Sequence, residues 1–345
     1  MSQLIVQFIN AGVGDCILIT DLATGKKILV DSGPSKGVGR ATVTRVLMQT
    51  LGDSNEIDLA ILTHNDDDHI GGFEGLIKSD IVSINKIIFN SIAELEDEPI
   101  ESSSKASYRQ DLNLYKIIKD TNIPIEGVVV DEDGSNVIEL GDVTLRFISP
   151  NDMKMNMLKK WAVREKKLAE KKEKERLAKS KKSSKNTAYA SLEQALTAIE
   201  IEDKFEPDKR EPNGSSLAFI LEYGEHRLLF LGDCHMDIVE GYLASKDQPQ
   251  CFDLVKLSHH ASEHNNSQEF FNQIDCKNFI ICSDGDNNHG HPSMKTIARL
   301  TKRFPDSFIH FTSDSEIINN FTKSFASRCH YPDDDIVEFK YELSR

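Results

Sequence analysis

The 345-residue sequence has no apolar run that approaches the ~20 uncharged residues a membrane helix needs. Its first residues, Met1 to Phe8, lack the basic segment and cleavable apolar core of a signal peptide, and we expect them to form a strand. The six cysteines include no Cys-x-x-Cys pair, which argues against a disulfide framework and against a structural zinc ribbon. We therefore expect a cytoplasmic protein that does not engage a membrane.

Positive charge is also scarce, because the formal net charge is −15, and this disfavours nonspecific attraction to nucleic acid. One segment reverses the balance: residues 154–185 hold 14 Lys or Arg against 4 Glu. Two interpretations stay open. The segment is a charged, solvent-exposed helix whose apolar positions are too sparse to bury a full face, or it is a basic arm that contacts phosphates.

Alternating strands and helices are predicted on both sides of this segment. The predicted strands span residues 4–8, 16–20, 27–30, 57–62, 84–89, 128–130, 143–148, 216–222, 227–231, 254–258 and 278–282. The predicted helices span 41–51, 73–78, 108–119, 153–182, 192–201, 237–243 and 294–304, the last one closing the domain. We predict one α/β domain over residues 1–345, built from two similar halves, with a basic helical insertion at 152–212.

The run from His64 to His69 places four potential metal ligands on one loop: His64, Asp66, Asp68 and His69. It follows an apolar strand and precedes Gly71-Gly72, which permit a tight turn. A solvated acidic loop is the alternative, but carboxylates without a cation seldom gather at the end of a buried strand. Imidazoles and carboxylates together suit zinc or manganese, so we predict a hydrolase centre with two divalent metal ions.

Further candidates follow other predicted strands. Asp233 comes after Gly232 and is either a turn residue or a carboxylate shared by two cations. The adjacent His259 and His260 are ligand candidates, because imidazole is the commonest metal ligand. Asp31 is either a turn-capping residue or the acceptor of a hydrogen bond that fixes the tautomer of a ligand histidine.

The run His289-Gly290-His291-Pro292 supports two interpretations. It is a turn with surface histidines, or His291 reaches the site and donates a proton to the leaving group.

The ordered set Asp31, His64-x-Asp66-x-Asp68-His69, Asp233 and His259-His260 resembles the metallo-β-lactamase superfamily. More narrowly, several segments resemble the hydrolase domain of ComEC, the DNA-uptake channel protein, and its free-standing relatives. These segments are Phe8 to Leu18, Leu140 to Val143, Asn213 to Leu217, Leu231 to Asp233, Ser258 to Ser262 and Gly290 to Pro292. The resemblance implies a four-layer αββα sandwich with the metals at the mouth between two sheets.

The same resemblance implies a role for each ligand. His64 and Asp66 would bind one metal, Asp68 and His69 the other, with Asp233 between them and either His259 or His260 completing the set. Asp66 stands where the wider superfamily more often has His, which makes manganese a competitor of zinc. Residues 213–217 contain no His, although many members supply a further ligand there, so one metal would bind more weakly. Ala261 replaces a usual Gly.

Such sites hydrolyse phosphodiesters, lactams, thioesters and other esters with a metal-activated hydroxide. We predict a phosphodiesterase, and specifically a nuclease, with Asp68 and His291 as catalytic residues. Four basic side chains of the insertion are expected to contact the nucleic acid: Lys159, Lys160, Arg164 and Lys167. The first alternative is a small-molecule hydrolase for a cyclic nucleotide, a phosphocholine-type ester or another ester. The second is a non-enzymatic role in which the insertion docks a protein partner, and pairing of two copies as a homodimer stays open.

Overall fold

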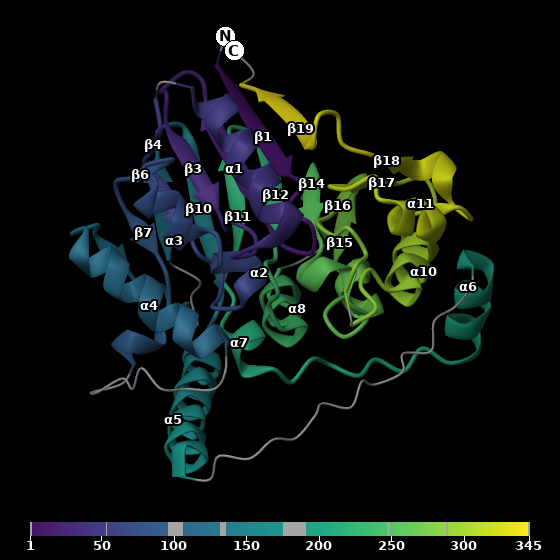
Figure 1. Cartoon of the computed structure of the whole chain (residues 1–345). Helices are drawn as coiled ribbons and strands as arrows, with labels where there is room; N and C mark the ends of the chain where they lie inside the picture. The colour runs from purple at the N-terminus through teal and green to yellow at the C-terminus, as the bar shows by residue number, and fades with distance from the viewer. Residues whose placement is uncertain are drawn as a thin grey trace.

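The computed structural model describes residues 2–52, 54–95, 106–131, 136–174, 191–246, 249–287 and 289–343. Two large sheets dominate this part of the chain (Figure 1). The first sheet has the order β19 (Ile336–Glu342), β1 (Gln3–Ile9), β2 (Ile17–Asp21), β3 (Lys27–Val30), β5 (Leu59–Ile61), β7 (Ile87–Ile88) and β8 (Ile125–Glu126). The second has the order β18 (Cys329–His330), β17 (Phe308–Phe311), β16 (Asn278–Ile281), β14 (Leu254–Lys256), β12 (His226–Phe230), β11 (Ala218–Tyr223), β10 (Val143–Ser149) and β9 (Val137–Leu140). Two small parallel pairs complete the strands: β4 (Glu56–Ile57) with β6 (Ser83–Ile84), and β13 (Gln250–Phe252) with β15 (Ile274–Cys276).

Both sheets follow the same plan. In the first sheet, β19, β1, β2 and β3 are antiparallel neighbours, and β5, β7 and β8 continue in parallel from β3. In the second, β9 to β12 are antiparallel neighbours, and β14, β16, β17 and β18 continue in parallel from β12. The strands β3, β5, β12, β14 and β16 therefore each belong to a parallel run.

The helices form the outer layers. They are α1 (Gly37–Leu51), α2 (Asp67–Ile70), α3 (Phe73–Lys78), α4 (Ala106–Asp120), α5 (Asp152–Lys174), α6 (Leu192–Ile201), α7 (Glu211–Gly214), α8 (Met236–Ala244), α9 (Gln268–Asn272), α10 (Met294–Arg303) and α11 (Glu316–Thr322). Three short 3-10 turns are η1 (Ile92–Glu94), η2 (Ser258–Ala261) and η3 (Ala326–Arg328). None of the described helices is long and apolar enough to pass through a membrane.

Successive side chains along a strand point to opposite faces of the sheet and so show which layer lies on each face. Along β2, Ile17 and Ile19 face a core shared with Phe219 and Phe230 of the other sheet, whereas Leu18 faces the core under α1, α3 and α4. On the second sheet, alternate residues pack instead against α6, α8, α9 and α10. The layers are thus helices, sheet, sheet and helices, and the predicted αββα sandwich is confirmed.

The predicted strand at 128–130 is wrong. Val128 and Val130 are buried against the core between the sheets, which explains the apolar pattern. The amide of Asn90, however, takes the place of a neighbouring strand. Its Nδ2 donates to the carbonyl oxygen of Val128 at 2.8 Å, and its Oδ1 accepts from Val128 N at 2.9 Å. Only a single bridge from Val130 to Asn151 is left.

The predicted closing helix at 294–304 matches α10, but the domain does not end there. The chain continues through β17, α11 and β18 into β19, which pairs with β1 from Gln3–Glu342 to Ile9–Ile336. The two termini therefore lie together in Figure 1.

The insertion lies between two antiparallel neighbours, β10 and β11, and contains α5, α6 and the start of α7. The apolar positions of its first helix were expected to be too sparse to bury a full face, and in the described part of α5 they are buried only in its first half. There Met155, Leu158 and Trp161 pack on Tyr108 of α4 in a small separate core. Leu168 is exposed, as expected, and Leu177 lies outside the described residues.

Lys154 does not fit the interpretation of residues 154–185 as an exposed basic arm. Its side chain is 6% exposed, and Nζ donates to Asp237 Oδ2 at 2.8 Å. It also lies 3.1 Å from His235 Nδ1. Lys154 therefore fastens the start of α5 to α8 and offers no free charge to a ligand.

Candidate metal centre

The candidate residues gather where the parallel strands of both sheets end. The loop from His64 to His69, which we call the metal loop, follows β5, and Asp31 follows β3. Asp233 comes after β12, and His259 and His260 come after β14. Because parallel neighbours end at the same edge of a sheet, four separate segments deliver side chains to one place.

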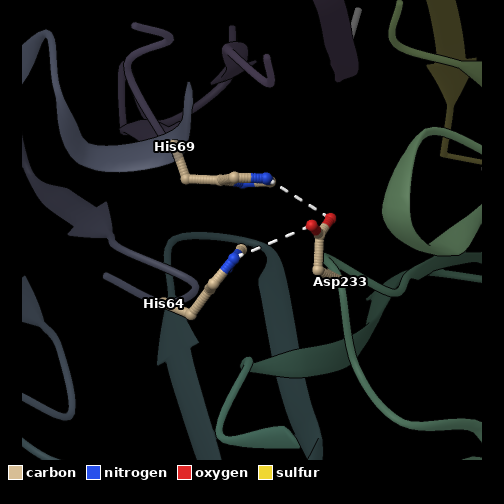
Figure 2. Close-up of side chains that lie close together, drawn as sticks. All are labelled: His64, His69 and Asp233. Carbon is tan, nitrogen blue, oxygen red and sulfur yellow. Dashed lines mark ion pairs between the residues drawn. The ribbon is translucent and has the colours of Figure 1, made fainter. Parts of the chain in front are cut away.

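His64, His69 and Asp233 converge on one point (Figure 2). Asp233 Oδ1 lies 3.3 Å from His69 Nε2, and its Oδ2 lies 3.7 Å from His64 Nε2. The three side chains are at most 2% exposed. The two carboxylate oxygens of Asp233 thus face different histidines, which is the arrangement expected of a carboxylate shared between two cations.

A second group of possible ligands consists of Asp68, His69 and His260. His260 Nε2 lies 3.1 Å from Asp68 Oδ2, and Asp68 Oδ2 lies 4.0 Å from His69 Nε2. His260 Nδ1 donates to the carbonyl oxygen of Cys282 at 2.7 Å, which orients the ring so that Nε2 is directed at the site.

His259 also points at the site, so the structure brings both adjacent histidines to Asp233. Its Nε2 lies 3.6 Å from Asp233 Oδ2, and its Nδ1 donates to Asn265 Oδ1 at 2.9 Å. The backbone adopts left-handed conformations at His259, His260 and Ala261, with φ of 48°, 51° and 63°. Three consecutive non-glycine residues in this region are strained, and the turn directs two neighbouring imidazoles to the same centre.

Asp66 is engaged by protein groups on both oxygens. Oδ1 accepts from Ser107 Oγ at 2.8 Å, and Oδ2 accepts from Arg210 Nη2 at 2.5 Å. The same Oδ2 lies 3.9 Å from His64 Nε2. Asp66 is therefore close enough to His64 to share a cation, with a guanidinium as its present partner.

Asp31 holds the metal loop from beneath. One of its oxygens accepts from Thr63 N at 2.8 Å, and the other accepts from Thr63 Oγ1 and from His69 Nδ1, each at 2.7 Å. The residue is fully buried. The contact with His69 fixes the tautomer in which Nε2 faces Asp233.

A buried ion pair lies under the centre. Lys256 Nζ contacts Asp15 Oδ2 and donates to the carbonyl oxygen of Gly232 at 3.0 Å. Asp15 Oδ1 lies 3.5 Å from His260 Nδ1. Gly14 is required beside it, because a Cβ there would meet the carbonyl oxygen of Asp68 at 1.9 Å. The turn before β2 therefore packs directly on the metal loop.

Charges within the centre shift several pKa values. Burial lowers the pKa of His64, helped by the neighbouring His69. For His69, burial is outweighed by Asp233, Asp31 and the other nearby carboxylates, and the pKa rises well above its usual value. The pKa of Asp233 falls well below the usual range, because the charges of the nearby histidines outweigh burial. In the absence of a cation, protons on histidine balance the carboxylates.

The donor set fits a divalent metal. Among the described residues, the buried atoms His64 Nε2, His69 Nε2 and Asp233 Oδ1 have no hydrogen-bond partner. Buried polar atoms nearly always have a hydrogen-bond partner. Because these three atoms face one another, we expect one bound group to be the partner of all three. Imidazole nitrogens with carboxylate oxygens are typical ligands of zinc and manganese.

A cavity of about 380 Å³ opens above these atoms. Its lining includes Asp233, both adjacent histidines, His289 and His291. The ring of His291 lies 4.7 Å from that of His259. Burial and the neighbouring His259 and His260 lower the pKa of His291 to about 2. His291 reaches the site, as one of the two interpretations expected.

The four basic residues of α5 that were expected to contact nucleic acid are not brought to this cavity. Lys159, Lys160, Arg164 and Lys167 are exposed and absent from its lining. Arg164 pairs with Glu211 of α7 at 2.5 Å.

Four further residues of the site were missed by the sequence argument: Asp15, Asp208, Arg210 and Asn265. Asp208 Oδ2 lies 3.5 Å from His259 Nδ1 and accepts from Asn213 Nδ2 at 2.6 Å. The turn Gly12 to Asp15 did carry a signal, since an acidic residue directly before a buried strand has to find a partner. Nothing in the local pattern around Arg210 indicates that it reaches across to the metal loop.

Comparison with known proteins finds a family model that matches part of the chain. Residues 9–149 match the family model of the metallo-beta-lactamase superfamily. The matched segment is therefore similar to a metallo-beta-lactamase domain over less than half of the chain. ComE operon protein 3 of Bacillus subtilis (strain 168) is 21% identical over 310 residues, which cover 86% of this chain and 30% of that protein. The chain thus spans less than a third of the length of this relative.

Solved structures that match this chain include a metallo-beta-lactamase fold protein, a diphosphatase and a metallo hydrolase. YhfI from Bacillus subtilis covers 99% of this chain and 100% of its own, with 12% identity and a TM-score of 0.46. A diphosphatase from the PhnP family covers 99% of both chains, with 11% identity and a TM-score of 0.44. Igni18, a metallo hydrolase from Ignicoccus hospitalis, covers 99% of this chain and 100% of its own, with 10% identity and a TM-score of 0.42.

The metallo-beta-lactamase match confirms the resemblance drawn from the sequence. It runs from β1 to β10 and includes Asp31 and the metal loop, whereas Asp233, His259 and His260 lie beyond it. It supports a metal-dependent hydrolase as the general class of activity.

Proposed function

We propose that this protein is a metal-dependent phosphodiesterase that cleaves nucleic acid, with Zn or Mn at the centre. The observation that supports it most is the convergence of His64, His69 and Asp233 at the base of an open cavity. Divalent cations bound there would lower the pKa of a water and neutralise charge that develops on phosphoryl oxygens. Asp68 and His260 would hold the second cation.

The helix α5 supports nucleic acid as the substrate. It projects from the sandwich next to α7 (Figure 1), and the ion pair between Arg164 and Glu211 ties it to that short helix. Lys159, Lys160 and Lys167 are exposed on the same helix. A polymer that enters the cavity at one phosphate extends beyond it, so basic side chains outside the lining can contact its other phosphates. The same exposed charges are where a protein partner would dock in the non-enzymatic alternative.

A small-molecule esterase is the second candidate, and the cavity itself favours it. A volume of about 380 Å³ falls within the usual range for small ligands. A cyclic nucleotide or a phosphocholine-type ester would need no contact with α5.

The deciding experiment neutralises charge on α5 without removing the helix, because deletion would expose the apolar surface under Met155, Leu158 and Trp161. The test variant is Lys159→Gln/Lys160→Gln/Lys167→Gln. The control variant is Lys78→Gln/Lys86→Gln/Lys340→Gln, whose lysine side chains are 58%, 42% and 54% exposed elsewhere on the surface.

Metal-loaded protein is assayed on single- and double-stranded DNA and RNA, on a cyclic nucleotide and on a phosphocholine ester. A nuclease should cleave the polymers and lose activity in Asp68→Ala. Its salt-dependence slope should fall by about 2 on single strands and about 3 on duplexes in the α5 variant but not in the control. Cleavage of only the small substrates, with no effect of the α5 variant, would support the second candidate. Protection of α5 from protease by a bound protein, without hydrolysis of any substrate, would favour docking.

A further inference from the structure

Arg210 is a cation already placed in the candidate centre. Its side chain is 47% exposed, lines the cavity and reaches Asp66 Oδ2 at 2.5 Å. Burial alone would lower the pKa of Arg210, but Asp66, Asp208, Asp233 and Asp68 raise it more. The guanidinium thus senses four carboxylates of the centre.

The backbone of Arg210 is fixed although its side chain is not. Arg210 N donates to Asp208 Oδ1 at 2.9 Å, and its carbonyl oxygen accepts from His235 Nε2 at 3.0 Å. Asp208 N in turn donates to the carbonyl oxygen of His264 at 3.0 Å. Because these hydrogen bonds hold the backbone, the long side chain of Arg210 can exchange one partner for another without movement of the main chain.

A bound cation competes with Arg210 for the same oxygen. Asp66 Oδ2 lies 3.9 Å from His64 Nε2. A metal held by these two atoms would therefore occupy the place beside Asp66 Oδ2 that the guanidinium now occupies. Asp66 Oδ1 is still held by Ser107 at 2.8 Å, which keeps the carboxylate in place. Metal binding would therefore weaken the pair of Arg210 with Asp66.

The released guanidinium would face an otherwise anionic wall. Among the described residues that line the cavity, Arg210 is the one Lys or Arg, whereas Asp67, Asp68, Asp233 and Asp286 all carry carboxylates. An anionic group that enters needs positive charge in addition to the metals. The planar guanidinium fits two phosphoryl oxygens at once.

We propose that Arg210 is a substrate-binding residue, which leaves Asp66 when a divalent cation binds there and then contacts a phosphoryl oxygen of the substrate. This inference rests on the proposed phosphodiesterase function for its substrate class. Arg210 thus acts as a stand-in cation in the metal-free centre and as a phosphate contact in the metal-loaded one.

The test compares Arg210→Ala and Arg210→Lys with Arg45→Ala. The control pair is closely matched, because Arg45 meets Asp335 at 2.5 Å with 45% of its side chain exposed, and it is absent from the cavity lining. Calorimetry measures binding of Mn²⁺ or Zn²⁺ to the metal-free protein. A second titration measures binding of inorganic phosphate to the metal-loaded protein, and thermal unfolding confirms that each variant folds.

Two opposite effects are expected of Arg210→Ala. Metal affinity rises by up to about fivefold, because an ion pair of this exposure is worth at most about 1 kcal/mol. Phosphate affinity falls by about 10- to 100-fold, the usual loss for a hydrogen bond to a charged group. Arg210→Lys should keep part of the phosphate affinity, and Arg45→Ala should change neither quantity. In a turnover assay the loss should appear in KM more than in kcat.

Unchanged phosphate affinity in Arg210→Ala would overturn the inference. Weaker metal binding in that variant would also overturn it, because Arg210 would then merely hold Asp66 for the metal. If the wild-type protein cleaves no phosphodiester yet shows the two opposite effects, the phosphodiesterase proposal fails while the anion contact stands.

Discussion

The carboxylate of Asp31 accepts a hydrogen bond from Nδ1 of His69 at 2.7 Å, and both side chains are fully buried. Asp31 also accepts hydrogen bonds from the backbone N and the hydroxyl of Thr63. Asp31 touches no other candidate ligand, so its influence on a metal passes through the orientation and the basicity of His69.

Replacing Asp31 with Asn should weaken metal binding by about 10- to 100-fold, because the amide cannot accept all three hydrogen bonds that now reach the carboxylate. Asn also tolerates the left-handed backbone at this position, where φ is 56°. Calorimetric titration with Zn²⁺ or Mn²⁺ measures the change. An unaltered metal affinity in a folded variant would show that Asp31 merely caps the turn.

Metal removal gives a prediction about stability. Chelation should lower the melting temperature, because each site filled at a hundredfold excess over its Kd adds about 2.7 kcal/mol. Asp233→Asn should remove most of this metal-dependent shift, since Asp233 contacts both His64 and His69. Thermal unfolding with and without metal provides the measurement. An equal shift in the variant and the wild-type protein would place the metal elsewhere.

The metal loop could be predicted from the sequence because its ligands lie within six residues and follow a strand. Asp233 and the pair His259-His260 could be found because each follows a buried apolar run. Arg210 and Asp208 could not, because they reach the centre from the irregular segment before α7, and no periodic pattern fixes the path of such a segment. The sequence predicts Asp15 only as part of a turn, because its partner Lys256 lies 241 residues further along the chain.

The limits on predicting the fold have similar causes. Most strands and helices could be read from apolar periodicity, as with α3 and α6, whose bounds agree with those predicted. Val128 to Val130 has the composition of a strand, yet the side chain of Asn90 occupies its hydrogen bonds. The segment β19 alternates well but pairs with β1 at the opposite end of the chain. Pairing between strands so far apart in the sequence depends on the tertiary structure, which a local sequence pattern does not encode.

Asp111 gives a prediction about pH. Burial raises its pKa to about 7, although hydrogen bonds from Ser91, from Asn65 at 3.0 Å and from Ile92 N at 3.1 Å oppose the shift. The folded state therefore holds a proton that the unfolded state releases above its ordinary pKa of about 4. Asp111 should thus lower the free energy of unfolding as pH rises from about 4 to about 7, by up to about 1.4 kcal/mol per pH unit.

The variant Asp111→Asn isolates this contribution because it cannot titrate. The difference between wild type and variant in the free energy of unfolding should change across that window and become constant above about pH 7. Urea unfolding at a series of pH values, with chelator present throughout, measures it. Parallel curves for the two proteins would show that Asp111 has the same pKa in the folded and unfolded states.

Arg299 gives a prediction about the link between the insertion and the centre. It is fully buried on α10 and donates to both oxygens of Asp203, at 2.7 to 3.1 Å. It also donates to the carbonyl oxygens of Glu263 at 2.8 Å and Asn266 at 2.9 Å. One side chain thus joins the segment that leads to Arg210 with the loop that carries Asn265, the partner of His259.

Arg299→Met should cost about 3 to 5 kcal/mol in the free energy of unfolding, because it leaves two carbonyl oxygens without their donor and Asp203 with Lys295, at 3.5 Å, as its remaining cationic partner. The exposed Lys302 on the same helix provides the control, and Lys302→Ala should change stability by less than about 0.5 kcal/mol. Chemical denaturation measures both. Because Asn265 orients His259, the Arg299 variant should also bind metal more weakly under conditions where it is fully folded. A stability loss without any change in metal affinity would mean that the loop keeps its conformation through its own contacts and that Arg299 only fastens the insertion.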